Sequence, residues 1–219
     1  MATEYPLADA GLADGREAAG RRSTSGRMLR HAGADRAFHW ITALTMFVLL
    51  ATSLLPLVGI RFAWVEIHWI AGLVLCALLL FHIVRALLVQ SQRLIWPRPA
   101  DLRELSGGRP GKYTLAQKLM HLAVSVALVT AAVTGVLLMI KAGTPLFERD
   151  PYVFSLRTWG VLTVLHDLSA FGSLFLVMLH IYFSLRPEKR MYLKSMIGGW
   201  VSREELRRYH DTDKVERGE

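Results

Sequence analysis

The chain has 219 residues, of which 53% are hydrophobic and 20% are charged, and its mean hydropathy of +0.32 is positive. A soluble domain of this length rarely sustains apolar runs of about 20 residues, the length that crosses a bilayer as a helix. The net charge is +8, and the basic residues that produce it are concentrated on alternate loops, as described below. This distribution is typical of membrane topology, so we expect no nucleic-acid partner.

The first thirty residues are rich in Ala, Gly and charged residues and contain no apolar segment of the kind that a signal peptide carries. A segment of this composition buries too little apolar surface to offset the entropy lost when the chain orders. We therefore expect residues 1–34 to form a disordered cytoplasmic tail.

Four apolar runs follow this tail, at about residues 38–59, 67–89, 119–140 and 160–185. Each is long enough to cross a hydrocarbon core of about 30 Å as a helix. The sequence thus predicts an all-α membrane protein, with a four-helix transmembrane bundle over residues 35–188. Residues 189–219 are expected to form a cytoplasmic C-terminal tail.

Basic residues are concentrated on alternate loops of this arrangement. Arginines precede the first run, arginines and lysines fill the loop between the second and third runs, and more follow the fourth run. The two remaining loops hold few. Because basic loops stay in the cytoplasm, both termini and the middle loop are predicted to be cytoplasmic.

Six of the eight histidines fall in or near the apolar runs, and ionisable residues inside spanning helices are costly and therefore functional candidates. His166 and His180 share one helix face at different depths, because fourteen residues give about 21 Å of rise and nearly four turns. With the orientation above, His166 lies at the outer level, as does His68 at the start of the second run.

Paired imidazoles in an apolar bundle suit haem better than zinc. Zinc takes four ligands, and no thiolate or carboxylate accompanies the histidines. Haem takes two axial ligands on opposite faces, and bundles often bind cofactors between facing helices. Small residues near the histidine face leave room for a porphyrin, namely Gly72, Ser169 and Ser173. The residues therefore predict two haem b groups, one in each leaflet.

Three histidines lie at the inner level and compete to pair with His180: His39, His82 and His121. Spacing alone does not choose among them. Arg36, which precedes the first of these histidines, and Arg85, which follows the second, are candidate partners of the haem propionates.

Six stretches carry a resemblance to a known family: DRAFHW at 35–40, IHWIAG at 67–72, GKYTLAQK at 111–118, VTGVLL at 133–138, the paired LH at 165–180 and SMIGGWVSREELRRYH at 195–210. Through them, residues 30–210 resemble the cytochrome b (gamma) subunit of membrane-bound formate dehydrogenases of the bacterial inner membrane. The resemblance implies that His68 and His166 hold the outer haem, and that His39 and His180 hold the inner one.

The resemblance also implies partners and a direction of electron transfer. Electrons would arrive from a periplasmic iron–sulfur subunit, after substrate oxidation in a molybdenum or tungsten catalytic subunit. They would reduce a quinone, menaquinone or ubiquinone, near the cytoplasmic side. The implied quinone pocket lies beside His180 and includes Tyr113, Thr114 and Gln117. Thr114 and Ala116 replace the Asn and Gly of the family pattern.

His82 and His121 depart from the pattern of that subunit, which has apolar residues at these positions. They are either hydrogen-bonded polar residues of the bundle without a further role, which we favour, or candidates for an alternative haem ligand or a proton relay. Hydrogenase cytochrome b subunits and self-standing cytochromes of the b561 type carry a histidine at the start of the third helix, so both are alternative families. A proton-conducting transporter without haem is a third alternative.

Overall fold

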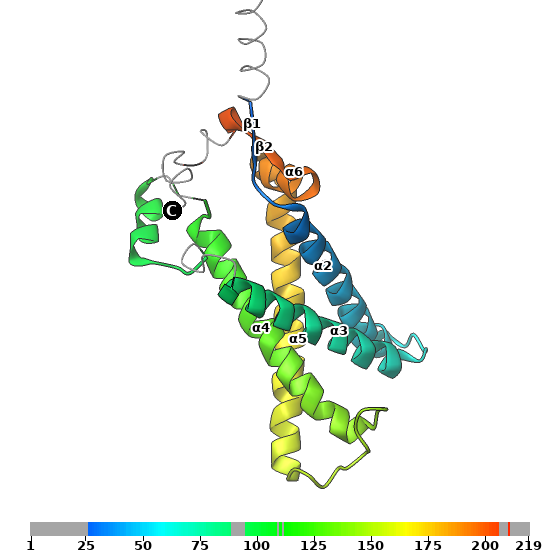
Figure 1. Cartoon of the computed structure of the whole chain (residues 1–219). Helices are drawn as coiled ribbons and strands as arrows, with labels where there is room; N and C mark the ends of the chain where they lie inside the picture. The colour runs from blue at the N-terminus through cyan, green and yellow to red at the C-terminus, as the bar shows by residue number, and fades with distance from the viewer. Residues whose placement is uncertain (1–25, 89–94, 109, 111, 206–209, 211–219) are drawn as a thin grey trace, which may run out of the picture.

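The computed structural model of the chain describes residues 26–88, 95–108, 110, 112–205 and 210. Four long helices dominate it (Figure 1): α2 (Gly33–Leu54), α3 (Trp64–Leu88), α4 (Leu115–Ala142) and α5 (Leu156–Leu185). All four are long and apolar enough to cross a membrane, which confirms the predicted all-α transmembrane fold. Each helix begins a few residues before its apolar run, because its polar first turn is helical as well.

The helices pack in neighbouring pairs. α4 packs along α5, α2 packs along α3, and α3 also contacts α4. A buried cluster of Met46, Leu75 and Leu128 joins α2, α3 and α4. Most other apolar side chains of the four helices are exposed, as is required of helices that face lipid.

Two short helices cover the connections between spans. η1 (Pro56–Val58) follows α2 and ends at Gly59, whose φ of +88° is a left-handed conformation that glycine adopts without strain. η3 (Pro99–Ser106) precedes α4.

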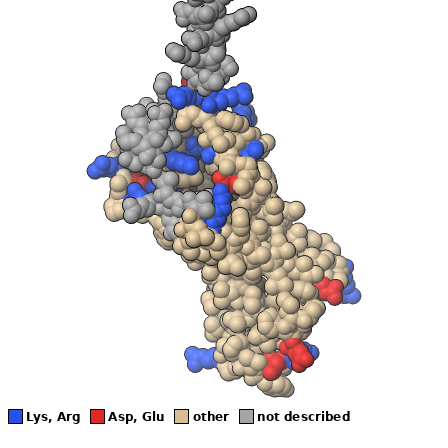
Figure 2. All heavy atoms as spheres, in the orientation of Figure 1, with Lys and Arg blue, Asp and Glu red and all other residues tan. Residues whose placement is uncertain are grey.

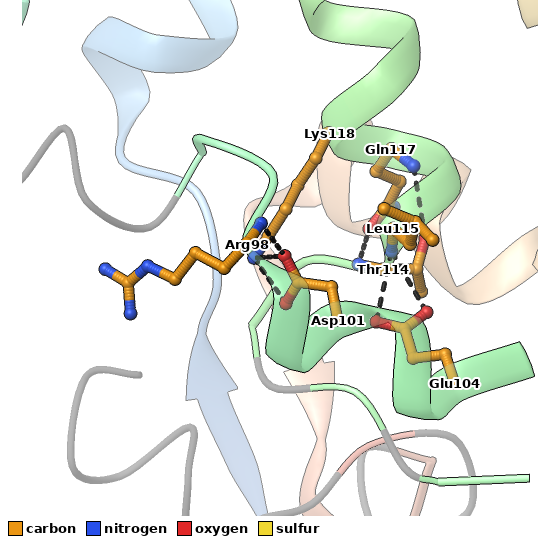
Figure 3. A network of polar contacts seen from close by, with 7 residues as sticks. All are labelled: Arg98, Asp101, Glu104, Thr114, Leu115, Gln117 and Lys118. Atoms are coloured by element: carbon orange, nitrogen blue, oxygen red, sulfur yellow. Dashed lines mark hydrogen bonds and ion pairs between the residues drawn. The ribbon is translucent and has the colours of Figure 1, made fainter. Parts of the chain in front are cut away.

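A polar network fastens η3 to the first turn of α4 (Figure 3). The Lys118 ammonium donates to both carboxylate oxygens of Asp101 at 2.8 Å, and Glu104 accepts from the amide of Leu115. Burial raises the pKa of Asp101, but the hydrogen bonds from Lys118 and the Arg98 amide and the lysine charge outweigh it. The pKa of Asp101 therefore lies below its ordinary value, which keeps the carboxylate ionised.

The two ends of the described chain meet beyond the bundle. β1 (Arg27–Leu29) pairs antiparallel with β2 (Trp200–Ser202), next to η4 (Pro187–Lys189) and α6 (Arg190–Gly198). We call β1, α6 and β2 the terminal clasp. The carbonyl of Gly199 accepts the amides of Arg30 and His31, and the Arg36 guanidinium donates to the carbonyl of Ile197. The clasp thus ties the start of α2 to the segment after α5.

The terminal clasp lies inside the segments that the sequence assigned to tails. Residues 27–29 form β1, and α6 and β2 follow residue 189, because each short strand finds its hydrogen-bond partner at the other end of the chain. The predicted disorder of residues 1–25 lies outside the described residues, as do positions 206–209 and 211–219.

Charged residues gather at the clasp end of the molecule. Figure 2 shows Lys and Arg around that end, an uncharged middle, and a mixture of acidic and basic residues at the opposite end. The loop after α2 and the loop after α4 lie at that opposite end (Figure 1). We call the clasp end the inner end and the opposite end the outer end.

Candidate metal centres in the helix bundle

The outer pair consists of His68 on α3 and His166 on α5. Their ring centroids lie 6.1 Å apart, and the ring planes are inclined at 77°. Two imidazoles that bind one metal ion from opposite sides, with metal–nitrogen bonds of about 2 Å, have centroids about 6 Å apart. The outer pair therefore has the spacing of two axial ligands.

Thr52 on α2 determines which nitrogen of His68 carries a proton. Its Oγ1 lies 2.8 Å from Nδ1 of His68, and the hydroxyl donates to the carbonyl of Val48 at 2.8 Å. A hydroxyl has a single proton, so Nδ1–H of the imidazole must donate to the threonine oxygen. The Nε2 lone pair of His68 is then free to bind a metal.

Thr134 on α4 plays the corresponding part for His166, whose ring also makes a hydrogen bond with the backbone of Ala131. Its Oγ1 lies 3.0 Å from Nδ1 of His166 and donates to the carbonyl of Thr130 at 2.6 Å. The next residue, Gly135, passes close to the same ring, since a Cβ there would lie 3.1 Å from Cε1 of His166. α4 therefore packs closely against the imidazole of His166.

The inner pair consists of His39 on α2 and His180 on α5. Their ring centroids also lie 6.1 Å apart, with planes inclined at 58°. Within the described part of the chain, no hydrogen bond reaches either ring. Of the three histidines that compete for His180 in the sequence, His39 is the one that faces it.

A third pair lies between α3 and α4. His82 and His121 have ring centroids 6.0 Å apart, and His82 also stacks on Phe38 at 5.0 Å with planes at 15°. No ring contact in the described residues joins either histidine to His180. The sequence placed both at the inner level but did not predict that they face each other.

Each of these pairs offers two imidazoles to a metal ion and, among the described residues, no third ligand. The described residues contain no group of three or more His, Cys, Asp or Glu side chains that could surround one metal ion. Two facing imidazoles complete the coordination of a haem iron, whose other four ligands belong to the macrocycle, but not that of tetrahedral zinc.

The space around the pairs also fits a flat macrocycle. In the described chain, α5 does not pack along α2 or α3 but meets them through the facing histidines. A Cβ at Gly72 would meet no atom within 4 Å, while Ser169 and Ser173 are buried on α5 and add little bulk. The hydroxyl of Ser173 is buried and has no hydrogen-bond partner among the residues that the structure describes. The residues present therefore fit haem.

The two candidate propionate partners both contact the protein. Arg85 forms an ion pair with Asp35, which lies one turn before His39 on α2. Arg36 donates from Nη1 to the clasp, but its Nε is buried without a hydrogen-bond partner among the described residues. Arg36 thus keeps one donor for an anionic group at the inner end, and its contact with a propionate stays a prediction.

The candidate quinone residues lie at the start of α4 (Figure 3). Thr114 caps this helix: its hydroxyl accepts from the amide of Gln117 at 3.2 Å, while the Gln117 side chain accepts from the amide of Thr114 at 3.0 Å. The Tyr113 ring lies 5.5 Å from the Lys112 ammonium. Among the described residues, no hydrogen bond or ring contact joins His180 to these side chains. The quinone pocket therefore stays a prediction.

Thr52 was not singled out in the sequence, and Thr134 and Gly135 were quoted only within the stretch VTGVLL at 133–138, without a role. A signal was present, because Thr52 lies near the outer end of α2 and Thr134 in the outer half of α4, at the depth of His68 and His166. Matching polar residues to histidines by depth would have found the two threonines. The contact made by Gly135 depends on how α4 packs against α5.

Comparison with known proteins identifies related chains. A family model described as prokaryotic cytochrome b561 matches residues 30–199, a stretch that contains all six bundle histidines. The cytochrome b556(fdo) subunit of formate dehydrogenase from Escherichia coli strain K12 is 26% identical over 208 residues, covering 87% of this chain and 92% of the relative. The cytochrome b556 subunit from Haemophilus influenzae is 22% identical over 213 residues, covering 86% and 82%.

Proposed function

The chain belongs to the prokaryotic cytochrome b561 family and is a membrane cytochrome b, and from this premise we propose that it is the dihaem subunit of a formate dehydrogenase. In this proposal it carries electrons from a periplasmic iron–sulfur subunit to a quinone near the cytoplasmic side. The basic residues at the inner end support an orientation with both termini in the cytoplasm of a bacterium.

The observation that carries the proposal is the presence of two histidine pairs with the same 6.1 Å separation at opposite ends of α5. The fourteen residues between His166 and His180 correspond to about 21 Å along the helix, most of the hydrocarbon thickness. His68 and His166 are the proposed outer axial ligands, and His39 and His180 the inner ones. When bound, haem b supplies reversible one-electron chemistry at each level.

The inner end supplies polar groups for a quinone. The Tyr113 hydroxyl and the Gln117 amide nitrogen have no hydrogen-bond partner among the described residues, whereas the Thr114 hydroxyl and the Gln117 carbonyl oxygen cap α4. Reduction of a quinone at this end takes its protons from the cytoplasm. The electron crosses from the periplasmic side to the cytoplasmic side. Moving one elementary charge across the membrane corresponds to a free energy of about 2.3 kcal/mol per 100 mV of membrane potential.

The relatives are named as subunits of formate dehydrogenase, which supports a complex with other dehydrogenase subunits. We infer an iron–sulfur subunit at the outer end and a molybdenum or tungsten subunit that oxidises the substrate. Substrate oxidation itself then lies outside this chain.

A second candidate function is supported by the pair of His82 and His121. A histidine near the start of α4 is a feature of the hydrogenase-type and self-standing b561-type cytochromes, and here it has a facing partner at 6.0 Å. In this alternative the chain exchanges electrons between quinone and a hydrogenase or a small diffusible reactant.

The test is purification of the chain from membranes of its own host in mild detergent. We expect a b-type α band on reduction with dithionite, loss of the band when a soluble quinone is added, and an iron–sulfur subunit in the same fraction. A chain that purifies alone and still exchanges electrons with quinone would favour the second candidate. The absence of any b-type α band would contradict both.

A further inference from the structure

The outer and inner pairs differ in the groups that hold their imidazoles. Both outer rings donate to a threonine hydroxyl, at 2.8 Å for Thr52 and 3.0 Å for Thr134. Building on the proposed function, we propose that these two threonines are positioning residues. They fix the tautomer and orientation of His68 and His166 and make the outer haem the one with the lower reduction potential.

The two hydroxyls are rigid acceptors. Thr52 is 3% exposed and Thr134 is 4% exposed, and each donates its only proton to a carbonyl of its own helix, four residues earlier. Each oxygen also lies within hydrogen-bond distance of the carbonyl three residues earlier. With the hydroxyl proton engaged by these helix carbonyls, an oxygen lone pair is left to accept Nδ1–H of the ring.

A hydrogen bond at Nδ1 changes the metal-binding nitrogen of the same ring. Donation from Nδ1–H to an oxygen makes the imidazole a more basic and electron-rich ligand. Such a ligand stabilises ferric iron more than ferrous iron, so the reduction potential falls. A threonine does this as a neutral group, so the hydrogen bond itself adds no charge to the outer half of the bundle, where Asp167 already adjoins His166.

The inner pair lacks this arrangement in the described chain. The nearest threonines on α2 do not serve His39, since Thr42 has no hydrogen-bond partner for its buried hydroxyl and Thr45 donates to the carbonyl of Ile41. Instead, arginines lie at the inner end, and positive charge favours the ferrous state. Both differences lower the outer potential relative to the inner one, so an electron that enters at the outer end moves energetically downhill towards the quinone.

The test is an optical redox titration of the purified holoprotein with Thr52→Val, Thr134→Val and both together. Valine keeps the shape of threonine and removes the hydroxyl. We expect the lower of the two midpoint potentials to rise. In the double variant the rise should be about 59 mV, which corresponds to a tenfold change in the ferric-to-ferrous ratio for a one-electron couple. The higher midpoint should not move, and the electron paramagnetic resonance signal of one low-spin ferric haem should change.

Two further variants separate the hydroxyl from its surroundings. Thr45→Val removes a buried hydroxyl whose hydrogen bond among the described residues goes to the carbonyl of Ile41 and not to a histidine, so it should leave both midpoints unchanged. Thr52→Ser and Thr134→Ser keep the acceptor and should retain the wild-type midpoint.

The outcomes decide between positioning and packing. If valine causes loss of the outer haem and serine restores it, the positioning role is supported. If serine also loses the haem, or if both valine variants retain two haems with unchanged midpoints, the proposal is overturned. A wild-type protein without haem b would instead contradict the proposed function itself.

Discussion

The outer and inner histidine pairs share one geometry but have different surroundings. Both have ring centroids 6.1 Å apart, and in both one histidine comes from α5. The outer rings are held by buried threonine hydroxyls from α2 and α4. The inner rings have no such partner among the described residues, and they lie near the ion pair of Asp35 with Arg85 and near a second pair of histidines.

Depth in the membrane explains this difference. The outer pair lies within the apolar part of the bundle, although Asp167 adjoins His166 in the sequence, and its imidazoles lie within hydrogen-bond distance of neutral threonine hydroxyls from α2 and α4. The inner pair lies at the end where basic residues gather, and charged groups there are close to the headgroup region and to water. One leaflet therefore orients its ligands with hydroxyls, and the other surrounds them with charge.

The largest expected effect is the loss of a haem on removal of a ligand. His166→Ala should remove the outer haem alone and His180→Ala the inner haem alone, because each ring supplies one of two axial bonds. Haem b per polypeptide, measured by the pyridine haemochromogen method, should fall from two to one in each variant.

The same measurement distinguishes between the two inner histidine pairs. His39→Ala should halve the haem content, whereas His82→Ala and His121→Ala should retain two haems. His39→Ala could instead retain both haems while His82→Ala or His121→Ala loses one. That result would show that His82 and His121 bind the inner haem.

A smaller effect is expected when Gly135 gains a side chain. Gly135→Ala places a Cβ 3.1 Å from Cε1 of His166, so the ring must shift by a few tenths of an ångström. The outer haem should bind about tenfold more weakly, while the inner haem is unaffected. Haem loss to apomyoglobin as a function of time measures this effect. Gly172→Ala on α5 is the matched control, since its Cβ would meet nothing within 4 Å.

Neutralising Asp35 tests the charged surroundings of the inner pair. Asp35→Asn removes a negative charge one turn from His39 and leaves Arg85 without its ion-pair partner. The higher midpoint potential should rise, by an amount that changes the ferric-to-ferrous ratio a few-fold at a fixed ambient potential. The lower midpoint potential should not move. Glu188→Gln, at a fully exposed carboxylate, serves as the control. Equal shifts of both midpoints would show that the two surroundings are not separate.

The smallest effect concerns the terminal clasp. Burial, together with the charges of Arg30 and Lys112, lowers the pKa of His31 to about 4, while Asp35 acts in the opposite sense. Between pH 6.5 and pH 4 the unfolded segment binds a proton that the folded clasp does not, so the clasp loses stability as the pH falls. The protection factors of the β1 amides, which correct for the intrinsic pH dependence of amide exchange, should fall as the pH is lowered over this window, and His31→Gln should flatten that dependence.

The sequence was sufficient for the four spans and for the grouping of histidines by depth, because both depend on helix length and rise alone. It left three candidates for His180, since spacing gives depth but not the direction in which neighbouring helices face each other. That His39 faces His180, and that His82 faces His121, depends on how α2 lies relative to α5 and on how α3 packs against α4. The roles of Thr52 and Gly135 depend on contacts between helices, which no single-helix pattern encodes.

The terminal clasp was beyond sequence reasoning for a different reason. β1 and β2 have three residues each, and neither has an alternating pattern long enough to indicate a strand. Their hydrogen bonds form only when the chain ends meet.

The most direct test of the account is to locate the iron atoms in crystals of the purified protein, by anomalous scattering at the iron absorption edge. We predict two iron sites per chain, one between His68 and His166 and one between His39 and His180. An iron site between His82 and His121, or a single iron per chain, would contradict it.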